Sequence, residues 1–306
     1  MTAPLSRLWI ARQLRHDPPR AKSLVMTVFG DAIAPRGGAV WLGSLITLLA
    51  PLGISERAVR TSVFRLVEEG WLEATRSGRR SQYRLSAQGA KRFLRAHQRV
   101  YAPPSRDWTG QWSLVVMAPD KITAAHKNAL KKELLWEGFA VLSNGLFAYP
   151  GDKSEAMSDI LSRTQARNKV LLLSAADPAV AGTLSLAAFA DSHWPLKEIS
   201  KSYGRFIRRF EGLLTPNEPL TEAEPEQAFA VRTLLIHAYR RVQLHDPQLP
   251  QVLLGESWPG ETAYTLCRSI YQQILTTSDH YVAATLQQEQ PTVHAVRAEF
   301  RQRFAA

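Results

Sequence analysis

The stretch Ile54–Ala90, ISERAVRTSVFRLVEEGWLEATRSGRRSQYRLSAQGA, decides the fold of the N-terminal third of this 306-residue chain. In its first part, Ser55 to Glu69, apolar residues recur at helical spacing while the arginines lie off that stripe. Ser55 is a residue type that caps helix N-termini, and Gly70 is one that ends helices. The pattern therefore predicts a helix over this segment.

After Gly70 the hydrophobic period changes from helical spacing to two. Residues 71–75 and 82–85 read as two strands, joined by a basic tip at 76–81 that contains Gly78. A helix followed by a basic β-hairpin is the order of a winged helix-turn-helix.

The charges of this stretch favour DNA as its partner. A recognition helix reads base edges from its N-terminal turns, and a wing with arginines holds phosphates or a narrow minor groove. The alternative without a function is a solvated helix beside a charged loop. The helix, the hairpin and the cations nevertheless have the order and spacing of a winged helix-turn-helix. The candidate DNA-binding residues are Ser55, Arg57, Arg60, Thr61, Arg65, Arg76, Arg79 and Arg80.

The net charge of the chain is +11, and it is unevenly distributed. Residues 1–106 carry 18 Lys and Arg against 6 Asp and Glu, whereas residues 107–306 carry 20 against 21. The excess positive charge therefore belongs to the N-terminal third, as in a nucleic-acid module attached to neutral domains.

The neighbouring segments complete a predicted DNA-binding domain at residues 20–101. Ser23–Ala34 and Val40–Ala50 read as supporting helices, and Gly89–Tyr101 as a basic helix that leaves the wing. The stretch Leu5–Leu14 is either an amphipathic helix that packs on a partner or a basic arm near DNA.

Beyond a proline-containing linker at 102–105, the chain is predicted to be α+β and multidomain. Residues 107–176 follow the order βαββαβ, which is ferredoxin-like and by itself says little about function. Residues 177–306 are predicted to form a helical domain for ligand sensing and dimerisation. The predicted helices there span residues 195–214, 226–243 and 261–276.

Cys267 is the one cysteine, which excludes a disulfide framework and a multi-cysteine metal site. Its apolar surroundings predict a buried thiol. The sequence has neither an apolar run long enough to span a bilayer nor a secretion signal, so we expect a cytoplasmic protein. Phosphate-cradling loops and a nucleophile elbow are also absent, so we expect no enzyme, no cofactor and no catalytic or metal-binding residues.

Four residues are candidates for binding a ligand: His237, Arg240, Arg241 and Trp258. Two arginines suit a phosphorylated ligand, yet arginines near a helix C-terminus also complement the helix dipole. A histidine on an apolar helix is more often a hydrogen-bonded core group. His245 and Asp246 read as a turn rather than a catalytic pair.

With these residues in view, the chain resembles the PaaX family of transcriptional repressors. The resemblance implies a dimeric repressor of phenylacetic acid catabolic genes that binds operator DNA and is released by phenylacetyl-coenzyme A. It does not identify ligand-binding residues. The motifs that carry it are 37–45 (GGAVWLGSL), 57–66 (RAVRTSVFRL), 69–72 (EGWL), 78–81 (GRRS), 235–241 (LIHAYRR), 246–250 (DPQLP) and 258–260 (WPG).

A second function class stays open: a nuclease or other enzyme built on the ferredoxin-like domain and targeted by the winged helix. A metal nuclease needs two or more convergent carboxylates. The middle segment supplies only isolated candidates such as Asp120 and Glu137.

Overall fold

A computed structural model describes residues 5–104, 108–118, 122–176, 183–214, 220–289, 295–301 and 303–304. Helices predominate, with two small sheets, which agrees with the predicted mixed class. The chain divides into two compact units. The first contains Met1–Pro103, Arg205–Arg241 and Thr262–Ala306, and the second Pro104–Gly204 and Val242–Glu261. The segment 177–306, predicted as one helical domain, therefore contributes residues to both.

The first unit begins with two helices, α1 (Leu5–His16) and α2 (Ala21–Val28). A π-helical turn (Phe29–Ile33) and a 3₁₀ turn (Ala34–Arg36) follow, so the helix predicted to Ala34 changes type at Phe29. The wider turn accommodates a close contact, because a Cβ on Gly30 would lie 2.8 Å from the ring of Phe93.

The next predicted helix, Val40–Ala50, is wrong at its start. Ala39–Trp41 form a strand, β1, and α3 spans only Leu42–Leu49, before a 3₁₀ turn at Ala50–Leu52. Val40 pairs with Tyr83 and Trp41 with Gln82. This pairing across the chain outweighs the local helical pattern.

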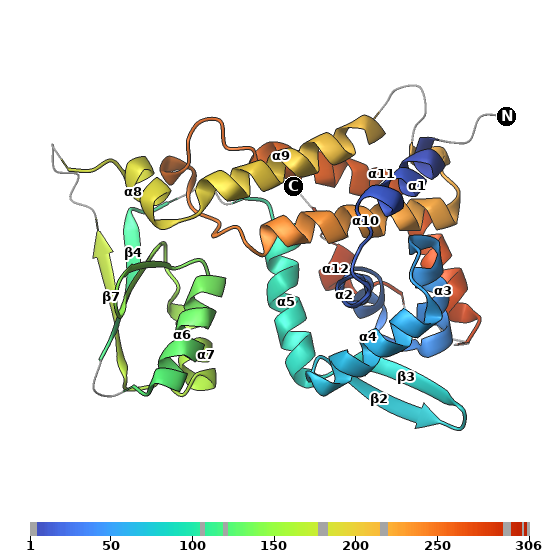
Figure 1. The fold of residues 1–306 in the computed structure, drawn as a ribbon, viewed down its shortest axis with the longest axis horizontal. Helices are drawn as coiled ribbons and strands as arrows, with labels where there is room; N and C mark the ends of the chain where they lie inside the picture. The colour runs from blue at the N-terminus through green and yellow to red at the C-terminus, as the bar shows by residue number, and fades with distance from the viewer. Residues whose placement is uncertain are drawn as a thin grey trace. The chain divides into compact units, whose positions relative to one another are not determined.

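The predicted helix and hairpin of the Ile54–Ala90 stretch are confirmed. The helix is α4 (Glu56–Glu68), and the hairpin consists of β2 (Leu72–Ser77) and β3 (Arg80–Leu85). An antiparallel sheet of order β1-β3-β2 results, and α5 (Ala87–Tyr101) follows it. Figure 1 shows the hairpin projecting beyond α4.

Apolar side chains of α2, α3 and α4 form the core beneath this hairpin. The fully buried members include Leu24, Val25, Leu45, Leu48, Val59, Val63 and Leu66.

The rest of the first unit comes from distant parts of the chain. The helix α9 (Leu196–Phe210) belongs to the second unit up to Gly204 and to the first from Arg205. A 3₁₀ turn at Glu211–Leu213 follows it directly, and another lies at Leu220–Glu222. Most of α10 (Pro225–Gln243) and α11 (Gly260–Gln287) also lies here, together with the short α12 (Ala298–Arg301).

The N-terminal helix α1 packs on these C-terminal segments. The indole of Trp9 donates to the carbonyl of Arg209 (3.1 Å), and its ring packs at a tilt against Phe210, with centroids 5.2 Å apart. Ser6 Oγ donates to Gln227 Oε1 at 2.7 Å. The segment Leu5–Leu14 is therefore helical, as one of its two alternatives predicts, but it packs on its own chain, and binding to a partner or to DNA stays a prediction.

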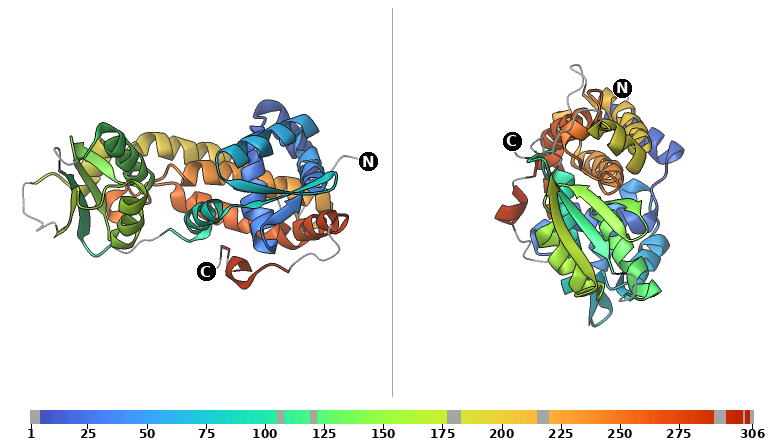
Figure 2. Two further views of the ribbon diagram at one scale, coloured as in Figure 1. Left: turned by 90° about the horizontal axis from the view of Figure 1, so that it is seen from below. Right: turned by 90° about the vertical axis from the view of Figure 1, so that its left-hand side faces the viewer.

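The second unit contains the predicted βαββαβ order. Its elements are β4 (Gln111–Met117), α6 (Ala124–Trp136), β5 (Ala140–Ser143), β6 (Leu146–Pro150), α7 (Ser154–Arg163) and β7 (Val170–Ala176). The strand order is β5-β6-β4-β7, and each adjacent pair is antiparallel. In the right-hand view of Figure 2 the strands of this sheet face the viewer.

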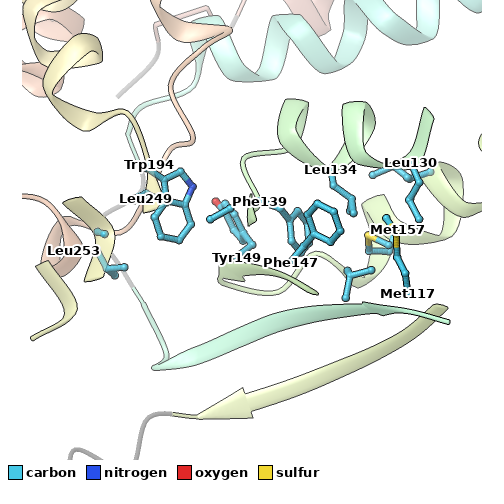
Figure 3. Close-up of a cluster of buried hydrophobic side chains, with 14 of the residues drawn as sticks. Met117, Leu130, Leu134, Phe139, Phe147, Tyr149, Met157, Trp194, Leu249 and Leu253 are labelled. Atoms are coloured by element: carbon cyan, nitrogen blue, oxygen red, sulfur yellow. The ribbon is translucent and has the colours of Figure 1, made fainter. Parts of the chain in front are cut away.

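Figure 3 shows the core of this unit, where Phe147 and Met117 from the strands meet Leu130 and Leu134 of α6. The core extends to α8 (Leu186–His193), and the indole of Trp194 donates to the carbonyl of Gly138 at 2.7 Å.

The proline-rich connection 244–250 is an ordered bracket beside this core. Asp246 accepts hydrogen bonds from the hydroxyl of Tyr203 and from the amide of Gln248. Its role in fixing the turn is thereby confirmed, and a 3₁₀ turn at Gln251–Leu253 follows.

Candidate nucleic-acid interface

The helix α4 is capped as its sequence predicts. Ser55 has extended backbone angles, and its Oγ accepts from the amide of Ala58 at 3.3 Å. At the other end Gly70 takes a positive φ of 70°, which favours glycine after a helix. These two residues fix the length of the helix and the position at which the hairpin begins.

One face of α4 is polar, cationic and open to solvent. Arg57, Arg60 and Arg65 are exposed there, and Thr61 Oγ1 donates to the carbonyl of Arg57 at 2.9 Å. Arg60 Nη2 lies 2.6 Å from Glu56 Oε1, in an exposed pair one helical turn apart. Such a pair is weak in water, so it is readily exchanged for a contact with DNA.

Phe64 also lies on this face, and the sequence prediction missed it. Its side chain is 61% exposed, although a phenyl ring gains by burial. The signal was available, since Phe64 follows Arg57 by seven residues and Arg60 by four, which places it on their side of the helix. An apolar group among cations suits a thymine methyl group.

The hairpin carries the second group of predicted residues. Ser77 pairs with Arg80, so the turn is formed by Gly78, with φ of 58°, and Arg79. Arg76 and Arg79 are exposed near this tip. Arginines on an exposed two-residue turn can contact a phosphate backbone.

Arg80 is held by the C-terminal part of its own unit. Its Nη2 lies 3.1 Å from Glu289 Oε1, and its guanidinium lies 5.4 Å from the ring centroid of Trp41. Glu289 also accepts from the amide and hydroxyl of Ser44, at 2.6 and 2.8 Å. Glu289 therefore connects the hairpin to the N-terminal turn of α3. The eight predicted residues are all exposed on α4 and the hairpin, but Arg80 has this second role.

The four predicted ligand-binding residues do not form one group. His237 is buried, and its Nδ1 lies 3.0 Å from Thr27 Oγ1, which also accepts from Arg240 Nη1 at 3.0 Å. Burial, followed by the nearby arginines, lowers the pKa of His237 to about 3, so the ring is neutral. His237 therefore has the properties of a core histidine.

Arg241 is exposed on α10, whereas Trp258 belongs to the second unit. The ring of Trp258 packs edge-on against Tyr203, with centroids 5.8 Å apart. Within that unit it serves as a packing residue.

A buried charged cluster, which the sequence prediction also missed, surrounds Asp31 in the π-helical turn. Arg232 Nε donates to Asp31 Oδ2 at 2.7 Å, and Arg303 Nη1 to Oδ1 at 3.0 Å. The hydroxyls of Tyr101 and Tyr271 donate to the same Oδ1. Burial raises the pKa of this carboxyl, but the two guanidinium groups outweigh it and hold the pKa below the usual value.

Cys267 is buried as predicted, and burial raises the pKa of its thiol well above the usual value. Glu137 lies 3.6 Å from Lys153, and Asp120 lies outside the described residues. The described part of the chain contains no group of three potential metal ligands. Among its helices, none has the length and apolar character needed to cross a membrane.

Three family models and a known repressor match this chain over most of its length. The PaaX-like protein family matches residues 20–89, the PaaX protein central Cas2-like domain residues 105–187, and the PaaX-like protein C-terminal domain residues 194–284. Transcriptional repressor PaaX of Escherichia coli (strain K12) is 39% identical over 268 residues, covering 87% of this chain and 84% of that protein. The chain belongs to the PaaX-like protein family.

A solved structure supports the fold. The uncharacterized protein Rv0674 from Mycobacterium tuberculosis matches 78% of this chain and 89% of its own, with a TM-score of 0.50 and 24% identity.

Proposed function

We propose that this chain is a DNA-binding transcriptional repressor in which residues 20–101 act as a winged helix-turn-helix. The observation that carries the proposal is the exposed cationic face of α4 beside a hairpin with arginines at its tip. That the E. coli relative is a transcriptional repressor supports it. Helix, wing and charge are the three features by which such a domain is recognised.

Within this domain we assign different tasks to the two groups of residues. Arg57 and Arg60 read base edges in the major groove, assisted by Ser55, Thr61 and Arg65. Arg76 and Arg79 hold phosphates or the minor groove, and Arg80 both contacts DNA and orients the wing.

The remaining segments would assemble and regulate the repressor. We assign residues 107–176 to a ferredoxin-like domain, supported by the strand order β5-β6-β4-β7. Residues 177–306 would contribute to ligand sensing together with the first unit, and to dimerisation together with this sheet. One winged helix covers a single half-site, so a homodimer would bind two half-sites one or more helical turns apart. We place the protein in the cytoplasm, as a non-enzyme without a resident cofactor.

The effector we propose is phenylacetyl-coenzyme A, acting on genes of phenylacetate catabolism. The resemblance of the sequence motifs to the PaaX family supports this assignment. To shift the repressor from 1:99 to 99:1, the thioester must prefer the released state by about 10⁴-fold, or roughly 5.5 kcal/mol. By linkage, operator DNA then weakens thioester binding by the same factor.

The test begins with selection of a duplex from a random-sequence library by the full chain. Its affinity is then measured against scrambled DNA at several salt concentrations, with and without phenylacetyl-coenzyme A and with free phenylacetate as the control. We expect specific binding that falls steeply with salt and is released by the thioester alone. Failure to select any duplex would contradict the DNA proposal, and equal release by phenylacetate would contradict the effector.

A further inference from the structure

A cavity of about 430 Å³ lies inside the first unit, away from the face of α4 assigned to DNA. Its walls come from α2 and the π-helical turn, from the end of β3, from one side of α5, and from Ile236, Arg240, Arg297 and Phe300. A volume of this size lies within the range of about 300–1,000 Å³ that is typical of small-molecule sites.

The lining of the cavity combines apolar and aromatic side chains with cationic ones. The buried lining contains Val100, Tyr101 and Ile236, and Phe300 adds an aromatic ring that packs edge-on against His97 at 4.9 Å. The exposed lining contains three cations: Arg84, Lys91 and Arg297. A ligand that fits has an apolar, aromatic end and a polyanionic end.

Asp31 contributes the carboxylate of the lining, and its charge is compensated. Its oxygens are occupied by the Arg232 and Arg303 guanidinium groups and by two tyrosine hydroxyls. Arg303 Nε also donates to His97 Nε2 at 3.1 Å. His97 Nε2 is therefore an acceptor, which leaves the other ring nitrogen to carry the proton and to act as a donor for a carbonyl oxygen.

We propose that this cavity is the effector site, and that it takes an arylacyl thioester of a phosphorylated carrier. The acyl group lies against the half-buried rings of Phe93, His97 and Phe300. The phosphates of the carrier lie beside the exposed Lys91 and Arg297 and beside Arg84, which exchanges its exposed pair with Glu73 for them. The cavity holds the acyl end only, so most of the carrier remains outside it. This inference rests on the proposed function, because it supplies the site at which the proposed effector acts.

The position of α5 explains how occupancy would reach the DNA-binding elements. One side of α5 lines the cavity, whereas Phe93 also packs edge-on against Trp71, at the start of the hairpin, at 6.0 Å. Ser86, the N-cap of α5, donates to the carbonyl of Gly70 at 2.6 Å. A ligand that displaces α5 therefore also displaces the junction between α4 and the hairpin. Such a ligand makes different contacts in the two positions of α5, which is what allostery requires.

The close approach of Gly30 to Phe93 makes this wall of the cavity tight. Asp31 of the π-helical turn is held by Arg232, Arg303 and Tyr271, and by Tyr101 at the C-terminal end of α5. An arriving acyl group therefore moves the N-terminal part of α5, which carries Phe93, rather than the turn.

Titration calorimetry of the full chain with phenylacetyl-coenzyme A tests the site. Two variants change it: Ala96→Trp fills the cavity from α5, and Lys91→Glu reverses one charge at the exposed rim. Arg12→Glu, the same kind of charge reversal on the exposed surface of α1, is the matched control. We expect Ala96→Trp to weaken thioester binding at least tenfold, Lys91→Glu to weaken it several-fold with a smaller salt dependence, and Arg12→Glu to bind as the unaltered chain does.

Lys91→Glu changes an exposed side chain, so it keeps the test decisive if Ala96→Trp fails to fold. Affinity for DNA and for the thioester is measured on each protein. If the unaltered chain binds the thioester and both variants bind it equally well, the cavity is not the site, while the proposed function stands. If the unaltered chain binds its operator but not the thioester, the proposed effector is wrong, and this inference with it.

Discussion

Asp31 and Arg232 form a buried ion pair that joins residues 201 positions apart in the sequence. Arg232 Nε lies 2.7 Å from Asp31 Oδ2, and the two side chains are 4% and 1% exposed. Arg232 reaches on to Ser278 and Asp279 of α11, and Asp279 pairs with Arg36 at 3.0 Å. The segment that leads into α3 and α4 is thereby bound to the C-terminal helices, so the first unit holds the elements assigned to DNA binding and the cavity in one framework.

The first prediction concerns this pair. Asp31→Asn keeps the shape of the side chain but leaves two buried guanidinium groups without their shared carboxylate. Removing one partner of a buried pair costs about 3–5 kcal/mol. The concentration of guanidinium chloride at which half of the protein is unfolded should therefore fall markedly. Asp159→Asn removes a carboxylate from an exposed pair with Arg163 and should cost about 0–1 kcal/mol. Equal effects of the two substitutions would contradict the role assigned to Asp31.

The second prediction is a dependence of stability on pH that originates at His237. The groups around it are Arg240, Arg241, Arg209 and Asp17, and burial is the largest cause that lowers its pKa to about 3. Because the folded value lies below the ordinary 6.5, protons bind preferentially to the unfolded chain. The stabilisation is complete above pH 6.5 and decreases as the pH falls toward the folded value.

Between pH 7 and pH 5 the free energy of unfolding should therefore decrease by about 2 kcal/mol through His237. Burial, followed by the nearby Arg303, lowers the pKa of His97 to about 4. His97 therefore adds a dependence of stability on pH with the same sign. Denaturant unfolding at pH 7, 6 and 5 measures the total, and His237→Gln should reduce the slope while keeping a hydrogen-bonding group beside Thr27. An unchanged slope in this variant would show that His237 is not responsible.

The elements that could be predicted from the sequence are those determined by local pattern. Ser55, Gly70 and the apolar stripe between them fix α4, and the alternation on either side of Gly78 fixes the hairpin. The strand β1 was not predictable, because its three residues are extended only through pairing with β3, more than 40 positions later. The contact that His237 and Arg240 share with Thr27 was not predictable for a related reason, because no local pattern indicates this partner. Ligand binding by the four candidates stays a prediction, and Arg240 lines the cavity.

The third prediction separates base reading from backbone contact. Arg60→Ala should weaken binding to the selected duplex by about 1–3 kcal/mol and relax preference at one position. Arg79→Ala should weaken binding to all duplexes nearly alike and reduce the salt slope by about 1. Fluorescence anisotropy on selected and scrambled duplexes across a salt series measures both. A similar loss on both duplexes for both variants would contradict the assignment of base reading to Arg60.

The fourth prediction concerns Phe64. Phe64→Ala should leave the midpoint of unfolding in guanidinium chloride nearly unchanged, because the ring is exposed. The variant should bind the selected duplex more weakly, with a smaller loss on the scrambled one. Replacing thymine by uracil at each position of the duplex identifies the methyl group that the ring contacts, since one such replacement should have no further effect in the variant. Full affinity of Phe64→Ala for the selected duplex would exclude Phe64 from the interface.

The last prediction concerns the proposed homodimer and the sheet of the second unit. In the cross-strand register Leu171 faces Val116 and Leu173 faces Leu114, whereas Leu172 faces Val115, which is fully buried under α6 and α7. Side chains alternate between the two faces of a sheet, so Leu171 and Leu173 lie on the face opposite these helices.

Leu171 and Leu173 are 57% and 41% exposed, and β7 is the last strand in the described sheet order. An apolar sheet face beside an edge strand favours association. A second copy presents the same leucines, so the two faces can pack together.

We expect the full chain to sediment as a dimer at micromolar concentration. Leu171→Lys and Leu173→Lys should convert it to a folded monomer, because each places a charge in the contact between copies. Leu184→Lys, which adds the same charge at a leucine that is 64% exposed outside the sheet, should leave the dimer intact. The monomeric variants should bind a single half-site as the unaltered chain does but lose most of the affinity for a duplex with two half-sites. A dimer that survives both lysine substitutions would place the interface elsewhere, and a monomeric unaltered chain would contradict the proposed assembly itself.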